Sequence, residues 1–150
     1  CFRRITAGRR SRYFLGSCKR MNSSKALQDH QRPAIVLLAH GSKNTAWREP
    51  FDRFIADLQT DPELPVIRLA FIEHCEPLLE DVLDVLFTQK CQTIHIQPLL
   101  ISGGFHLEVD VPTRLQHWRE SHPEIDISLD KALLEHALMR QAIRTIVKQR

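Results

Sequence analysis

The sequence lacks long apolar runs, and its cysteines follow no recognisable pattern. Its longest apolar segments, such as residues 34–39, are strand-length, far below the roughly 18 residues of a membrane span. We therefore expect no membrane association. The four cysteines include no C-x-x-C pair, which argues against a zinc knuckle or a disulfide framework. Such thiols stay reduced in the cytoplasm, so a cytoplasmic protein is expected.

Phosphate-binding loops and a basic domain surface are also missing. Neither G-x-x-x-x-G-K-[ST] nor G-x-G-x-x-G occurs, so we expect no nucleotide cofactor. The net charge of +3 arises from residues 1–20, which contain seven basic residues and no acidic residue. Residues 21–150 hold 14 basic and 18 acidic residues, so nothing in this charge favours nucleic acid as a partner.

Residues 1–32 differ in character from the rest of the chain. They show no sustained apolar period and are rich in Arg, Ser, Asn and Gln. Met21 could be a native start, and the Arg-rich, acid-free composition of residues 1–20 also resembles an organellar transit peptide. We interpret 1–32 as a disordered or non-native N-terminal extension, and 33–150 as one α/β domain.

From Pro33 onward, apolar runs of strand length alternate with stripes of helical period. Strands are predicted at 34–39, 66–71, 93–97 and 125–129. Pro77 is predicted to open the second helix. The third helix should start near His106, and Asp130 should cap the last one. The helical stripes are Phe51, Phe54, Ile55 and Leu58; Leu78, Leu79, Val82, Leu83 and Leu86; Leu107, Val111, Leu115 and Trp118; and Leu134, Leu138, Ala142 and Ile146.

This β-α-β-α-β-α-β-α order predicts a three-layer α/β/α domain. Strands that alternate with helices form a parallel sheet with helices on both faces, joined by right-handed crossovers. We expect a four-stranded sheet with strand order 2-1-3-4.

Three polar segments follow the first three predicted strands. Ligands bind outside the carboxyl ends of parallel strands, so His40, Glu73 and His106 should meet at one edge of the sheet. Imidazoles ligate metal ions, and a carboxylate can accept a proton. Structural alternatives stay open for each: His40 as a strand cap, Glu73 as a helix cap, and His106 as an exposed side chain. His95, inside a strand, is interpreted as structural.

Together these segments resemble the sirohydrochlorin chelatases of the small, single-domain cobaltochelatase type. The motifs that carry the resemblance are residues 38–43 (LAHGSK), 70–73 (AFIE) followed by Pro77, 98–100 (PLL) through Gly104 and His106, and 110–112 (DVP). It covers residues 33–150. Leu100 stands where the family usually has an aromatic residue, a mild departure.

The resemblance implies a chelatase fold and the insertion of a divalent metal ion into sirohydrochlorin without ATP, in cobalamin or siroheme biosynthesis. The metal is a substrate, with Co²⁺ favoured and Ni²⁺ or Fe²⁺ possible. It implies that His40 and His106 bind the metal, with Glu73 as a third catalytic residue. Ser42, Gly103 and Gly104 would line the tetrapyrrole site, and the chain would act as a homodimer.

Other functions remain open from the residues themselves. The same histidines would serve a non-catalytic carrier of metal or tetrapyrrole. Gly103 and Gly104, before a helix N-terminus, would also suit a phosphorylated metabolite. Lys43, Arg48 and Arg114 are candidates to anchor substrate carboxylates.

Overall fold

The computed structural model describes residues 33–150, so the interpretation of residues 1–32 lies outside the described part of the chain. Four parallel strands form one sheet: β1 (Ala34–Ala39), β2 (Val66–Phe71), β3 (Thr93–Pro98) and β4 (Asp126–Leu129). Their order is β2-β1-β3-β4, which confirms the predicted topology. The strand pairing aligns Ala39 with Phe71 and Leu38 with Pro98, so the first three strands end at one edge.

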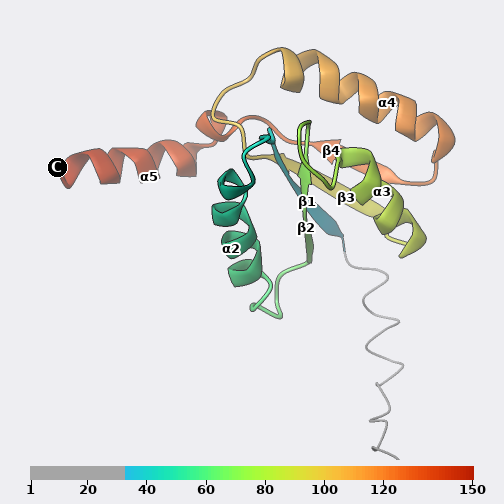
Figure 1. Cartoon of the computed structure of the whole chain (residues 1–150), viewed down its shortest axis with the longest axis horizontal. Coiled ribbons are helices and arrows are strands. Elements are labelled where there is room, and N and C mark those ends of the chain that lie inside the picture. Colours follow the sequence, from blue (N-terminus) through green and yellow to red (C-terminus); the bar gives the residue numbers. More distant parts are fainter. Residues whose placement is uncertain (1–32) are drawn as a thin grey trace, which may run out of the picture.

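Side chains that alternate along the strands form two apolar clusters, one on each face of the sheet. Helices α3 (Leu79–Thr88) and α4 (Val111–Ser121) cover one face, where Val36, Leu38, Ile94 and Ile96 are buried (Figure 1). The opposite face carries Leu37, Ile67, Leu69 and Phe71, against which α2 (Glu49–Leu58) packs. The central strand β1 therefore contributes to both clusters, as the continuous apolar run of residues 34–39 predicted.

The second helix begins later than the sequence suggested. Helix α3 starts at Leu79, two residues beyond Pro77, so the prediction that Pro77 opens it was wrong. The main-chain N–H of Leu78 donates to the Asp81 carboxylate at 2.9 Å, which closes the first turn instead. The Pro77 carbonyl accepts a hydrogen bond from the Phe71 N–H at 3.0 Å, which ties this segment to β2.

The C-terminal segment departs most from expectation. Asp130 does not cap a helix: a short 3-10 turn, η3 (Leu133–Glu135), intervenes, and helix α5 (Ala137–Lys148) begins after His136. The predicted stripe is therefore split, with Leu134 in η3. Helix α5 buries none of its residues and projects away from the sheet (Figure 1).

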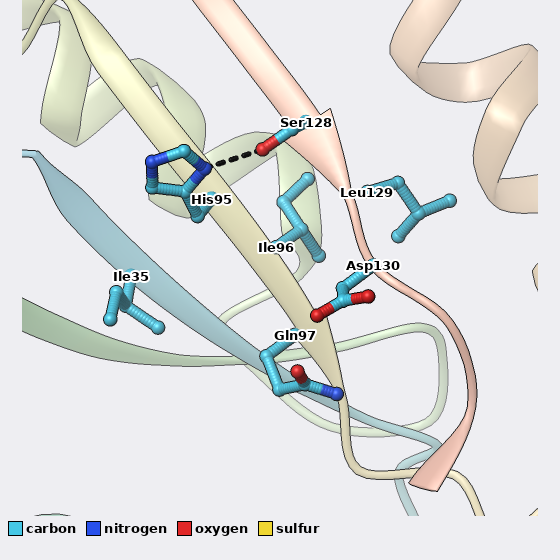
Figure 2. A pocket seen from close by; sticks show the side chains of 7 residues that line it. All are labelled: Ile35, His95, Ile96, Gln97, Ser128, Leu129 and Asp130. Carbon is cyan, nitrogen blue, oxygen red and sulfur yellow. Dashed lines mark hydrogen bonds between the residues drawn. The ribbon is translucent and has the colours of Figure 1, made fainter. Parts of the chain in front are cut away.

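Because α5 projects outward, the sheet keeps an open area beside α2. An open depression of about 430 Å³ lies over β3 and β4 on that face (Figure 2). His95 lies there as an exposed residue and hydrogen-bonds Ser128. In the described part of the chain, no helix is both long and apolar enough to cross a bilayer.

Candidate metal centre

The ends of β1 and β2 bring His40 and Glu73 together. The parallel ladder continues one step past the strands, because the Glu73 N–H donates to the His40 carbonyl at 3.1 Å. Gly41 then turns the chain with φ of +101°, a conformation that side-chain-bearing residues rarely adopt. A Cβ at position 41 would lie 1.7 Å from the Glu73 carbonyl oxygen. Only glycine therefore permits this close approach of the two strand ends.

The third side chain, that of His106, lies at the start of a turn of π-helix. Residues His106–Asp110 form this turn, η2, directly before α4, where a plain α-helix was expected. The Val111 N–H donates to the His106 carbonyl, an i to i+5 hydrogen bond that inserts one extra residue into the helix. Such π-turns are frequent at functional sites, because they turn a side chain away from the regular helical face.

The three side chains meet in one cluster. Single ligand atoms of His40, Glu73 and His106 all lie within 4.8 Å of one another. The imidazole rings of His40 and His106 are 5.0 Å apart between centroids and nearly perpendicular. Their side chains are 43% and 36% exposed, and that of Glu73 is 39% exposed, so the cluster is open to a large ligand. It borders a cavity of about 260 Å³ formed with residues 100–107.

Both imidazoles are oriented by a hydrogen bond at Nδ1. His40 Nδ1 lies 3.3 Å from the Gly41 carbonyl, which accepts only when Nδ1 carries the proton. His106 Nδ1 lies 3.3 Å from Asp110 Oδ2. With Nδ1 protonated, each ring keeps the lone pair of its Nε2 atom for a metal ion, the usual arrangement of metal-binding histidines.

Behind His106, an ion-pair network holds Asp110 in place. Arg114 lies 3.7 Å from Asp110 Oδ2 through its guanidinium, and it forms a two-pronged pair with Glu80. It also donates to the Ile72 carbonyl at 2.9 Å. The hydrogen bond from Arg114 lowers the pKa of Glu80, and the same bond raises the pKa of Arg114. The network thus links the segment after β2 with α3, η2 and α4 behind the cluster.

The remaining predicted residues occupy varied positions. Gly103 and Gly104 line the cavity, and neither adopts positive φ. The Ser42 hydroxyl accepts the Asn44 N–H at 3.1 Å and so stabilises the turn after β1. Arg48 and Arg114 are less available to a substrate than the sequence suggested. Arg48 pairs with Asp52 and donates to the Glu76 carbonyl.

Sequence reasoning undervalued two residues of this site. His74 was not among the predicted site residues, yet its Nε2 lies 3.1 Å from Glu73 Oε1. Its φ of +67° turns it toward Glu73, which nothing in the local sequence announces. Asp110 was noted only as part of the 110–112 motif. Its spacing of four residues from His106 was the signal for their contact.

Two imidazoles and a carboxylate at an accessible sheet edge form an incomplete ligand set of the kind that suits a transition-metal ion. The family model described as CbiX matches residues 34–150. The chain belongs to the CbiX family.

Relatives agree with this assignment in sequence and in structure. The chain is 30% identical over 82 residues to the sirohydrochlorin cobaltochelatase of Sulfolobus acidocaldarius, covering 55% of this chain and 65% of that one. It is 24% identical over 94 residues to the sirohydrochlorin ferrochelatase of Priestia megaterium, covering 63% of this chain and 35% of that one. It thus spans less than two thirds of these curated relatives.

Two solved structures share the fold. The crystal structure of a CbiX protein from Marinobacter aquaeolei VT8 matches with a TM-score of 0.67 and 28% identity, over 78% of this chain and 95% of that one. The sirohydrochlorin chelatase SirB from Bacillus subtilis subspecies spizizenii, in complex with cobalt, matches with a TM-score of 0.63 and 25% identity. That match covers 69% of this chain and 44% of SirB.

Proposed function

We propose that this protein inserts a divalent metal ion into sirohydrochlorin without ATP, in the biosynthesis of cobalamin or siroheme. The observation that carries the proposal is the convergence of His40, Glu73 and His106, whose ligand atoms lie within 4.8 Å of one another. The choice of sirohydrochlorin as the substrate comes from the names of its relatives, sirohydrochlorin cobaltochelatase and sirohydrochlorin ferrochelatase.

The two histidines are proposed to hold the incoming ion. Metal insertion requires that the ion lose its water, stay above the ring and exchange its ligands for four ring nitrogens. Neutral imidazoles suit Co²⁺, Ni²⁺ and Fe²⁺, and two of them leave most coordination positions open. A closed set of four protein ligands would hold the ion in a structural site instead. The Nε2 atoms of His40 and His106 therefore suit delivery better than storage.

Glu73 is proposed to accept the pyrrole protons. The ring must lose two protons as the metal enters, and a carboxylate within reach of the metal can take them. Glu73 Oε1 lies 3.7 Å from His40 Nε2 and 3.1 Å from His74 Nε2. His74, 40% exposed, offers a route by which each proton passes from Glu73 to solvent.

We favour Co²⁺ as the substrate metal and a homodimer as the working form. An imidazole and carboxylate set does not distinguish cobalt from iron or nickel, so the preference rests on the small cobaltochelatases alone. The match covers 44% of the SirB chain, so two copies of this chain would together correspond to about one SirB molecule. The reduced thiols of Cys75 and Cys91 suit a cytoplasmic setting.

The test is a metallation assay with purified protein, sirohydrochlorin and Co²⁺, Ni²⁺ or Fe²⁺, followed by the absorbance change of the ring. The protein should accelerate insertion of at least one ion. His40→Ala and His106→Ala should each abolish most of that acceleration. His117→Ala, at a side chain that is 90% exposed, is the matched control and should retain it. Equimolar binding without acceleration would contradict catalysis and favour a carrier of metal or tetrapyrrole.

A further inference from the structure

Three large apolar side chains are exposed in the segment that carries His106. Ile101, Phe105 and Val109 are 60%, 70% and 49% exposed. Phe105 is more exposed than any other phenylalanine or tryptophan of residues 33–150. Exposed apolar residues that occur singly are normal on a protein surface, whereas several that gather beside a site mark a surface that binds a ligand.

Phe105 lies directly beside the proposed metal ligands. Its ring centroid is 6.0 Å from that of His106, and the two ring planes are inclined by 72°. The His106 ring in turn lies 5.0 Å from the His40 ring. Ile101 and Phe105 both line the cavity of about 260 Å³ that these two histidines also line. A ligand that fills this cavity at the metal centre therefore contacts both apolar side chains.

The residues between Ile101 and Phe105 are small. Ser102, Gly103 and Gly104 line the same cavity, and a Cβ atom at Gly104 would meet nothing within 4 Å. This stretch therefore presents only main chain and one hydroxyl, while the residues at its two ends present large apolar side chains. Such a low surface gives a broad contact area to a flat ligand.

The polar groups of this cavity do not suit a phosphorylated ligand. Among the described residues that line it, none is Asp, Glu, Lys or Arg. The N–H groups of Leu107 and Glu108 both donate to the Gly104 carbonyl, at 3.0 Å and 2.8 Å, so they are not free to cradle a phosphate. An apolar conjugated ring needs no cation, and its π-face packs favourably against another aromatic ring.

The exposed side chains do not hold the loop in place. Neither Ile101 nor Phe105 belongs to the two apolar clusters of the core. The main chain is fixed instead by hydrogen bonds, such as the one that the Leu134 N–H donates to the Ile101 carbonyl at 3.0 Å. Contact with a ligand therefore accounts for these side chains better than stabilisation of the fold does.

We propose that Ile101 and Phe105 form the surface on which one face of the substrate's flat tetrapyrrole ring rests, with Phe105 as the residue that positions the ring. This assignment rests on the proposed function, from which it takes the substrate. A ring that stacks on Phe105 also lies beside His106, where its nitrogens can take up the ion that His40 and His106 hold. Recognition at this surface acts through the face of the ring, not through its carboxylates.

The first test is equilibrium binding of metal-free sirohydrochlorin in the presence of a chelator, followed by ring absorbance. Phe105→Ala should raise the Kd for the ring about tenfold or more, because it loses both apolar area and the aromatic face. Phe105→Tyr keeps the ring and should stay within about twofold of the unmodified protein. Phe54→Ala is the matched control, since Phe54 is also exposed, at 47%, but does not line the cavity. Equal ring affinity of Phe105→Ala and Phe54→Ala would overturn the proposal.

The second test separates contact with the ring from an indirect effect through His106. In a Co²⁺ titration without tetrapyrrole, Phe105→Ala should keep the affinity of the unmodified protein. In the metallation assay, its KM for sirohydrochlorin should rise by a larger factor than its kcat falls. A parallel loss of Co²⁺ affinity would mean that Phe105 acts by holding His106, which overturns the proposal.

The two tests also distinguish this inference from the proposed function. A protein that binds the ring through Phe105 but does not accelerate metallation would contradict the proposed function while supporting the stacking surface. Acceleration that Phe105→Ala retains with an unchanged KM would overturn the stacking surface alone. An unmodified protein that does not bind sirohydrochlorin would overturn both.

Discussion

Replacing Gly41 by alanine should disrupt the metal centre through the backbone alone. The added Cβ would lie 1.7 Å from the Glu73 carbonyl oxygen and 2.9 Å from its carbonyl carbon, whereas separations under 3.0 Å essentially never occur. Both partners are backbone atoms, so no side-chain rotation relieves the contact. The strand ends must separate by more than about 1 Å, which breaks the hydrogen bond between the Glu73 N–H and the His40 carbonyl.

The expected loss in free energy of unfolding is the sum of three contributions and the steric overlap. The φ of +101° costs an alanine about 1–2 kcal/mol. Each lost main-chain hydrogen bond adds about 1 kcal/mol. Alanine also restricts the unfolded chain, which offsets about 0.4–1 kcal/mol. With the steric overlap included, Gly41→Ala should lower the free energy of unfolding by about 3 kcal/mol or more, in the tail of single substitutions.

The assay is urea unfolding followed by tryptophan fluorescence, with the midpoint and the slope fitted separately. Gly104→Ala is the matched control, since nothing lies within 4 Å of a Cβ there and its φ is not positive. That variant should stay within about 0.5 kcal/mol of the unmodified protein. If Gly41→Ala proved as stable as Gly104→Ala, the steric reasoning about the two strand ends would be refuted.

Two further outcomes concern the network behind His106. Asp110→Asn should weaken metal binding about 10–100-fold while the fold stays intact, because His106 loses the carboxylate that orients it; an unchanged affinity in a metal titration would remove Asp110 from the site. Arg114 lowers the pKa of Glu80, so this pair stabilises the protein above the ordinary value of 4.5 and loses that effect as pH falls through the lower folded-state pKa. Glu80→Gln should therefore flatten the decline of unfolding free energy below pH 4.5, and identical pH profiles for both proteins would contradict this.

Much of the fold and part of the site could be read from local patterns. Apolar runs such as 34–39 and helical stripes such as Leu107, Val111, Leu115 and Trp118 encode burial directly, and the structure buries them as predicted apart from Ile35, which is half-buried. Since the sheet is parallel, strand ends share an edge, and this brings His40, Glu73 and His106 together without knowledge of any distance. The contact of His74 depends on a positive φ that the local sequence does not indicate, whereas the spacing of four residues between His106 and Asp110 was visible in the sequence.

The sequence alone therefore determined the order of the strands, the faces they bury and the edge that carries the two histidines. These depend on period and connectivity, which are local properties of the chain. Only the tertiary structure decided how close the ligand atoms come, which cations are already paired, and that α5 leaves its own sheet uncovered. An amphipathic stripe indicates that one side of a helix is apolar, but the chain path before the helix decides in which direction it leaves the domain.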